Sequence, residues 1–525
     1  MMPSSLLLLA AALALHLQGP PPCGVPARSR PRCVATAETT AIQAGDEWFD
    51  AALSVRPSAP SSLQVVREEA AAALGATRRP RRKDEAWRRT DLSSLFASTL
   101  VSPPGAVSDD ALQRVADSRG EFCASLVFVD GMLSEELSEL GDLPDGVVAS
   151  TLGRLPGTLP DGAVDALRTL PETGADPRLE LGAYVFGALN QAALADVAYI
   201  SVPADVHVDK PVRALFLSSA APAAKAEGDG PRTLGGRTLA YSCPNLLVRV
   251  AEGGKLSLLQ QYAGAGGEDA GGYFTNGLTR VDLAERAQLT HSYVQEQVEG
   301  AIHVDSIFAR CAAAASYTPS VVQTGGAIAR TNLGVRLQQD SARVDISGIS
   351  LGARRQLIDL HSAVRHVAPN CESSQVHRNA LAGRSRVVFK ATVHVPLGAD
   401  NTTANQLCRT LLLSDGARVD VSPSLEILTD EVPTISAQDI RRDRGSRSRQ
   451  GLRSWSGICC DACVRSQVVC THGATIADLD DEMVFYLQSR GLTRRQASGD
   501  GIGGARPASS ALPVSLSGDS RRRVR

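Results

Sequence analysis

The chain has 525 residues, of which 43% are hydrophobic and 21% are charged, and its formal net charge is −2. This length predicts about two to four domains, and the near-neutral charge gives no overall field that would attract nucleic acid. A chain this long with 11 cysteines is not a disulfide scaffold, and single thiols scattered along it are typical of a reducing compartment. The chain lacks the motifs of P-loop NTPases, zincins, serine hydrolases and dinucleotide enzymes, so none of these classes is expected.

Residues 1–40 are predicted to be a bipartite targeting presequence. The stretch "SSLLLLAAALALHLQG" has an apolar run of signal-peptide length, and the Ser-, Thr- and Arg-containing stretch after it resembles a transit peptide. Such a combination is typical of proteins sent to plastids. No later segment approaches about 18 continuous apolar residues, so we expect no membrane association of the mature form.

Residues 41–175 are predicted to form an N-terminal helical region. The segments "AIQAGDEWFDAALSV" and "SSLQVVREEAAAALGA" have apolar residues at helical spacing, and "SDDALQRVADSRG" opens with a helix cap. The segment "ASLVFVDGMLSEELSEL" predicts a strand, an Asp-Gly turn and then a Ser-capped helix.

Residues 176–432 are predicted to be a β-repeat core, since short alternating apolar runs recur after polar turns. The recurring phrases are "EGGKLSLL", "ERAQLTHS", "DSARVDIS", "GRSRVVFK" and "DGARVDVS". Their spacing of about 30 residues indicates stacked β-coils, with an ordinary β-sandwich as the alternative.

The C-terminal part divides into three segments. Residues 433–468 are Arg/Ser/Cys-rich without a β pattern, residues 469–497 end the core and include a helix over 479–492, and residues 498–525 have the Gly/Ser composition of a disordered tail.

Three groups of residues could carry chemistry. Cys470 and His472 lie two apart, so in an extended strand they share a face and could bind a metal or handle sulfur and protons. A second group, the thiols of "CCDAC" (Cys459, Cys460 and Cys463), could complete a zinc site with Cys470 or His472, but the spacing is not that of a known finger. The third group is loose and is interpreted as structural, hydrogen-bonded residues. Its members are His361, His366, Cys371 and His377.

Several blocks of the chain resemble the SufB/SufD family of iron–sulfur cluster assembly scaffolds. "DEAWRRTDLSSL" is similar to the family's entry motif, and "NLLVRVAEGGKLSLLQQY", "SSQVHRNALAGRSRVVFKATVHV" and "LLLSDGARVDVSPSLEILTDEV" are similar to its core blocks, in order. The block "VCTHGATIADLDDEMVFYLQSRGL" carries Cys-x-His-Gly-Ala-Thr, the SufD form, through Gly473, Ala474 and Thr475.

This resemblance implies a mainly β fold, a right-handed parallel β-helix with flanking helical regions. It implies a non-enzymatic scaffold subunit that pairs with SufB, binds the ABC-type ATPase SufC and shares a transient iron–sulfur cluster with SufB. His472 would then act at the SufB interface, with Cys470 as the adjacent thiol, and both could be metal ligands. Some complexes of the family carry reduced flavin, to which no residue here is assigned. The implied location is the plastid stroma.

Two features depart from the family pattern. Residues 433–468 separate two strands that should follow each other closely, so we interpret them as an unspliced intron or a lineage-specific loop. Residues 498–525 replace the family's further amphipathic helices, which indicates a misjoined end and puts SufC docking by this sequence in doubt. The competing hypotheses are a stand-alone Cys-rich metal-binding or redox protein and a purely structural β-helix binding module.

Overall fold

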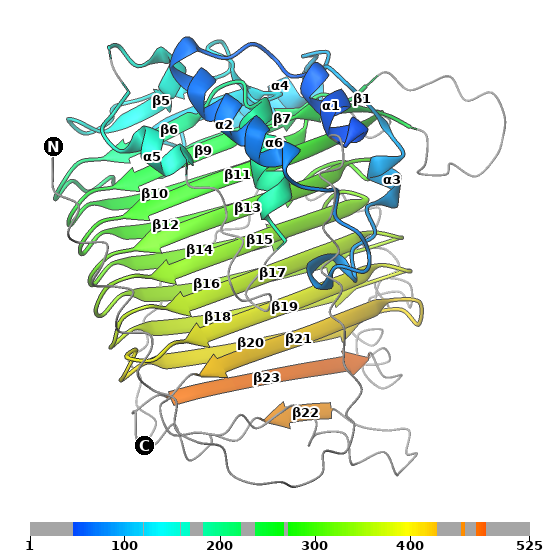
Figure 1. The fold of residues 1–525 in the computed structure, drawn as a ribbon, viewed down its shortest axis with the longest axis vertical. Helices are drawn as coiled ribbons and strands as arrows, with labels where there is room; N and C mark the ends of the chain where they lie inside the picture. Colours follow the sequence, from blue (N-terminus) through cyan, green and yellow to red (C-terminus); the bar gives the residue numbers. More distant parts are fainter. Residues whose placement is uncertain are drawn as a thin grey trace, which may run out of the picture. The chain divides into compact units, whose positions relative to one another are not determined.

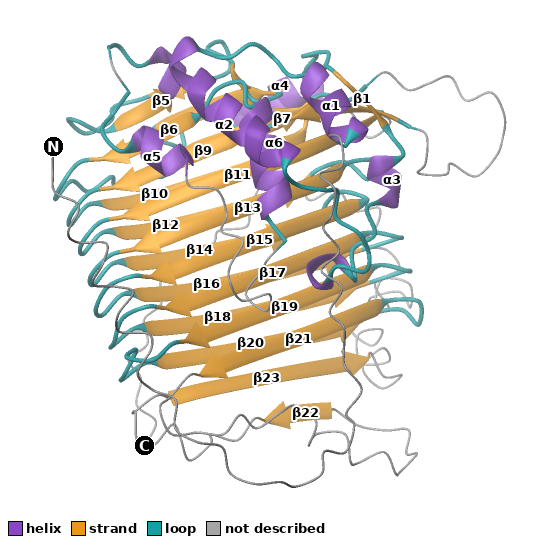
Figure 2. Ribbon diagram, viewed as in Figure 1, coloured by secondary structure: helices purple, strands orange, loops and turns teal. Residues whose placement is uncertain are grey.

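The fold is built from two facing β-sheets with helices near one end (Figures 1 and 2). The structure, a computed structural model, describes residues 46–118, 120–157, 159–168, 182–221, 237–266, 271–427, 453–456 and 469–478. The helices are α1 (Glu47–Ser54), η1 (Ser61–Leu63), α2 (Gln64–Gly75), η2 (Glu85–Trp87), α3 (Ser93–Phe96), α4 (Asp109–Asp117), η3 (Leu152–Arg154), α5 (Ala163–Arg168) and α6 (Tyr184–Ala193).

Each sheet stacks its strands in a single spatial series. Sheet A runs through β21 (Arg418–Ile427), β19 (Arg386–Val395), β17 (Leu357–His366), β15 (Ile328–Leu337), β13 (Ile302–Cys311), β11 (Gly272–Leu283), β9 (Asn245–Val250), β6 (Ala198–Val202) and β5 (Val148–Thr151). Beside this series, β8 (Thr238–Ser242) pairs with β11, and β1 (Thr99–Val101) pairs with β8. Sheet B runs through β22 (Arg453–Ser456), β23 (Val469–Asp478), β20 (Thr403–Leu412), β18 (Glu372–Leu381), β16 (Arg343–Gly352), β14 (Ser316–Gln323), β12 (Gln288–Glu296), β10 (Lys255–Gly264), β7 (Val212–Ser218), β2 (Ala124–Val129) and β3 (Met132–Leu133), with β4 (Glu139–Leu140) beside β2.

Successive strands from β10 to β21 alternate between the two sheets, so each turn of the chain adds one strand to each sheet. Within this range, neighbouring strands of a sheet are parallel, and they pair residues about 30 positions apart, as in Gln288 with Ser316. The result is a parallel β-solenoid of about 6 turns with flanking helices, which confirms the predicted β-helix and rejects the β-sandwich. The main apolar core lies between the sheets and continues along the stack from Ala124 to Cys470.

Three of the five recurring phrases, at 252–259, 285–292 and 340–347, share one turn conformation before a strand of sheet B, whereas the phrases at 383–390 and 415–422 precede β19 and β21 of sheet A. Two residues before a strand of sheet B, the chain places a residue with positive φ, as at Arg286, Ala314, Ser341 and Asn370. The N–H of Ala314 donates to the carbonyl of Asp340 at 2.9 Å, and the N–H of Arg286 donates to Ala313 at 2.9 Å. Each such turn is therefore tied to the next turn of the solenoid, and the repeat has a backbone cause.

The predicted N-terminal helices are confirmed as α1, α2 and α4. Ser108 caps α4, and its side chain accepts a hydrogen bond from the N–H of Ala111. Among the described residues, no helix is long and apolar enough to cross a membrane.

In the N-terminal region, the predicted strand and Asp-Gly turn are confirmed, but the helix predicted after them is not. Asp130 and Gly131 have φ of 53° and 86°, which fits the expected tight Asp-Gly turn between β2 and β3. The prediction of a Ser-capped helix after this turn is wrong. The chain instead makes a second turn and then forms β4, which pairs with Ala124 and Ser125 at the start of β2. Backbone pairing with β2 overrides the local helical preference of "SEELSEL".

Candidate functional site

Strand β23 forms the last described parallel strand of sheet B. It pairs with β20 in continuous register from Thr403 with Val469 to Leu412 with Asp478. The side chains follow this register, since Thr471 Oγ1 donates to Asn405 Oδ1 at 2.7 Å across 66 positions of sequence. The strand therefore resumes the solenoid after the long segment that separates it from β21 (Figure 1).

Cys470 and His472 both lie on β23, as the motif predicts. Cys470 is buried and belongs to the apolar core between the sheets, and its backbone pairs with that of Ala404. The backbone of His472 pairs with that of Gln406, and Gly473 and Ala474 follow opposite Leu407 and Cys408. The structure thus brings the predicted motif residues onto one strand at the end of the core.

Gln406 of β20, which the sequence does not single out, pairs with His472 of β23. It is 6% exposed, and among the described residues neither its side-chain nitrogen nor its oxygen has a hydrogen-bond partner. A buried amide without partners is costly, so such a group in a folded protein needs an explanation.

The other described cysteines are buried free thiols at separate positions along the core. Burial raises the pKa of Cys311 to about 12 and that of Cys408 to about 11. At neutral pH these thiols are protonated and weakly reactive, so they serve as small core residues.

The group His361, His366, Cys371 and His377 does not form one site, which agrees with its structural interpretation. His366 Nε2 lies 2.8 Å from Ser373 Oγ, and His377 Nε2 lies 2.9 Å from Ser350 Oγ. Burial lowers the pKa of His366 to about 4 and that of His377 to about 3, so both imidazoles are neutral.

His361 instead belongs to a buried ionic network beneath η2. Its Nε2 lies 3.0 Å from Asp359 Oδ1, and its Nδ1 lies 3.1 Å from an amino group of Arg330. Asp359 also contacts Arg330 at 3.1 Å and accepts a hydrogen bond from Thr90. Burial opposes ionisation of Asp359, but the charges and hydrogen bonds of these neighbours outweigh burial and lower its pKa.

The segment over this network is the predicted family entry motif. The guanidinium of Arg330 lies 3.8 Å from the ring centroid of Trp87 and donates to the carbonyl of Ala86 at 2.6 Å. Arg89 extends the contact to sheet A by donating to Ser422 at 2.6 Å. The motif therefore fastens the N-terminal region across β15, β17 and β21.

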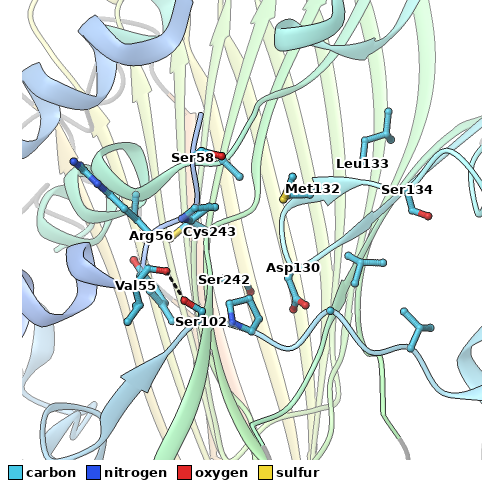
Figure 3. A pocket seen from close by; sticks show the side chains of 18 of the residues that line it. Val55, Arg56, Ser58, Ser102, Asp130, Met132, Leu133, Ser134, Ser242 and Cys243 are labelled. Atoms are coloured by element: carbon cyan, nitrogen blue, oxygen red, sulfur yellow. Dashed lines mark hydrogen bonds between the residues drawn. The ribbon is translucent and has the colours of Figure 1, made fainter. Parts of the chain in front are cut away.

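A cavity of about 750 Å³ lies at the end of sheet B opposite β23, where β2 and β3 stand (Figure 3). Its lining includes Met132, Cys243 and Asp130, whose carboxylate accepts hydrogen bonds from the N–H and hydroxyl of Ser219. Burial raises the pKa of Cys243 to about 12. None of the predicted site residues lines this cavity.

The segment 433–468 contains one short strand although its sequence has no β pattern. Strand β22 lies within it and pairs antiparallel with β23, with the backbone of Trp455 opposite that of Ala474. Pairing with an open strand edge explains how a sequence without alternation forms a strand. Cys459, Cys460 and Cys463, the helix expected over 479–492 and the tail lie outside the described residues. Within the described ranges, no group of three or more His, Cys, Asp or Glu side chains is arranged to hold a metal.

Two family models match the chain. The model described as the SufBD protein N-terminal region matches residues 47–214. The model described as SUF system FeS cluster assembly, SufBD core domain, matches residues 233–436 and 462–499. The interruption of the second match falls inside the segment between β21 and β23.

Curated relatives agree with these matches. The chain is 28% identical to Protein ABCI7, chloroplastic, of Arabidopsis thaliana, over 85% of this chain and 82% of that protein. It is 28% identical to an iron–sulfur cluster assembly SufBD family protein of Synechocystis, over 82% and 83% of the two chains. It is 24% identical to the iron–sulfur cluster assembly protein SufD of Escherichia coli, over 80% and 81%.

Proposed function

The chain belongs to the SufB/SufD family of iron–sulfur cluster assembly proteins, and on that basis we propose that it is a SufD-type scaffold subunit without turnover of its own. The observation that carries this proposal is β23, which continues the solenoid in register and presents Cys-x-His-Gly-Ala-Thr on its last described turn. Similarity to the Escherichia coli protein named SufD supports the choice within the family.

The proposed partners are a SufB-type subunit and the SufC ATPase. The solenoid stacks by backbone pairing, and β21 stands at the edge of sheet A in the described part of the chain. A strand edge can accept a strand from a second protein, so the end of the stack supports pairing with a similar solenoid. SufC is proposed from family membership alone, because residues 498–525 replace the helices that the resemblance implies for SufC docking.

The proposed cargo is iron and sulfide, which are assembled and passed on rather than kept as a resident cofactor. His472 would act as a ligand or a proton-handling group, with Cys470 beside it. A neutral imidazole is one of the ligands that iron accepts in proteins. The remaining ligands would come from the partner subunit.

The proposed location is the plastid. The Arabidopsis relative is named as chloroplastic, and residues 1–40 have the composition of a signal followed by a transit peptide.

The test is co-expression of the chain with SufB and SufC, comparing the natural sequence with His472→Ala. We expect the His472→Ala complex to form, as judged by size-exclusion chromatography. Its cluster yield, measured by absorbance and by iron and sulfide content, should fall about tenfold. Thr471→Ala on the same strand is the matched control, and its yield should not change. An unchanged yield in an intact His472→Ala complex would remove the role given to His472.

The same preparation distinguishes the scaffold proposal from the competing hypothesis. A stand-alone metal or redox protein centred on Cys459, Cys460, Cys463 and Cys470 would carry metal in the purified single chain and lose it on Cys460→Ser. The scaffold proposal expects the cluster only in the complex.

A further inference from the structure

Gln406 occupies a position that the preceding turn of the solenoid occupies with Gln375. The two residues are paired in register on β18 and β20, and both are buried, at 3% and 6% exposure. They provide the same side chain in the same place, one turn apart, so the two environments can be compared directly.

Gln375 is fully supported across the interior. Its side-chain nitrogen donates to Ser362 Oγ at 2.7 Å, and Ser362 donates to its oxygen at 3.0 Å. One turn later, the register places Ala391 where Ser362 stood. Alanine offers no hydroxyl, so the opposite sheet gives Gln406 nothing to bond.

The remaining neighbour of Gln406 in sheet B is β23. Its backbone partner there is His472, and the buried thiol of Cys470 lies two residues earlier on the same strand. Both polar ends of the Gln406 amide lack a partner, although burial of such a group is unfavourable unless a hydrogen bond compensates it. The amide thus has its unused donor and acceptor next to the motif strand.

We infer that Gln406 is a positioning residue of the assembly site, whose amide holds the motif strand β23 in place opposite Gln406, at position 472, while a cluster is assembled. The inference rests on the proposed function of β23. Groups that hold a metal ligand in place are a regular part of metal sites, because the ligand needs a fixed orientation. In this interpretation, the amide of Gln406 is available to the next turn because position 391 has an alanine where the preceding turn has Ser362.

The experiment compares Gln406→Leu with the matched variant Gln375→Leu, each in the full chain co-expressed with SufB and SufC. Gln406→Leu removes an amide without partners, so the melting temperature of the purified chain should rise by about 1–2 °C, while cluster yield falls about tenfold. Gln375→Leu leaves Ser362 unpaired, so it should lower the melting temperature and keep the yield per folded complex. Gln406→Met, with an unbranched side chain, should behave as Gln406→Leu does.

The results for the glutamine variants and for His472→Ala together decide the role of Gln406. Loss of yield with a raised melting temperature supports the inference, because a purely structural residue would not separate the two. A normal yield in Gln406→Leu, with His472→Ala still defective, overturns the role of Gln406 and leaves the proposed function intact. Parallel loss of stability and yield in both glutamine variants also overturns it. A normal yield in His472→Ala overturns the proposed function itself.

Discussion

The histidines of the middle turns and the histidine of the last turn are the same residue type in different surroundings. His291, His303, His366 and His377 are buried between the sheets, and each ring has at least one hydrogen bond to a neighbouring side chain. His472 lies on the terminal strand, opposite a glutamine that has no partner. In a repetitive fold, the position of a residue in the stack therefore says more about its role than its type.

The largest expected effect concerns the middle-turn histidines. Burial lowers the pKa of His291 to about 4 and that of His303 to about 3, with similar values for His366 and His377. Between these values and the ordinary pKa of about 6.5, the unfolded chain binds more protons than the folded chain, so stability falls as pH falls. Lowering the pH from about 7 to about 5 should reduce the free energy of unfolding by on the order of 5 kcal/mol.

Two carboxyl groups act in the opposite direction. Burial raises the pKa of Asp130, and it raises the pKa of Asp305 to about 6, so the folded state takes up these protons before the unfolded chain does and gains stability as pH falls. Denaturant unfolding at several pH values measures the net slope, and His377→Gln should reduce it by about one proton. A flat profile would contradict the assignment of neutral, buried imidazoles.

The next effect concerns the buried ionic network that contains His361, Asp359 and Arg330. Asp359→Ala leaves Arg330 buried without its carboxylate, and we expect a loss of about 3–5 kcal/mol in unfolding free energy. The control is Asp282→Ala, which breaks the half-exposed pair with Arg310 and should cost less than about 1 kcal/mol. Equal losses in denaturant unfolding would show that the network under Trp87 contributes no more than a surface pair.

The smallest effect concerns the turns that the middle of the solenoid repeats. Ala314 has φ of 53°, a conformation that costs alanine more than glycine. Ala314→Gly should therefore stabilise the chain by about 0.5 kcal/mol after the greater unfolded-state freedom of glycine is subtracted. Ala312→Gly, two positions earlier and without positive φ, should destabilise the chain, and thermal unfolding of both variants would measure the opposite signs.

Much of the fold could be predicted because successive turns of the solenoid share a recurring sequence pattern. Residues with positive φ precede the strands of sheet B, so polar turns and alternating strands recur together. The helix expected after Asp130-Gly131 failed because pairing with β2 decides that segment, and β22 was missed because only its partner β23 makes it a strand. Both errors are tertiary effects on short segments.

The motif strand could be predicted as well, but its neighbour could not. Cys470 and His472 lie two positions apart in one motif, whereas the lack of partners around Gln406 depends on alanine at position 391 of the other sheet. That contrast appears only when the two turns are compared in space.

The continuous register of β23 on β20 has a kinetic consequence. In a one-dimensional stack each unit is stabilised by its neighbours. On one side β23 is paired only with the four-residue strand β22, so it opens more often than an internal strand between two long neighbours. Amide hydrogen exchange should therefore accelerate from β18 through β20 to β23, and a partner that caps the stack would slow exchange at its last rung. The strand that carries Cys470 and His472 would then be the part of the solenoid that most needs a second subunit to hold it closed.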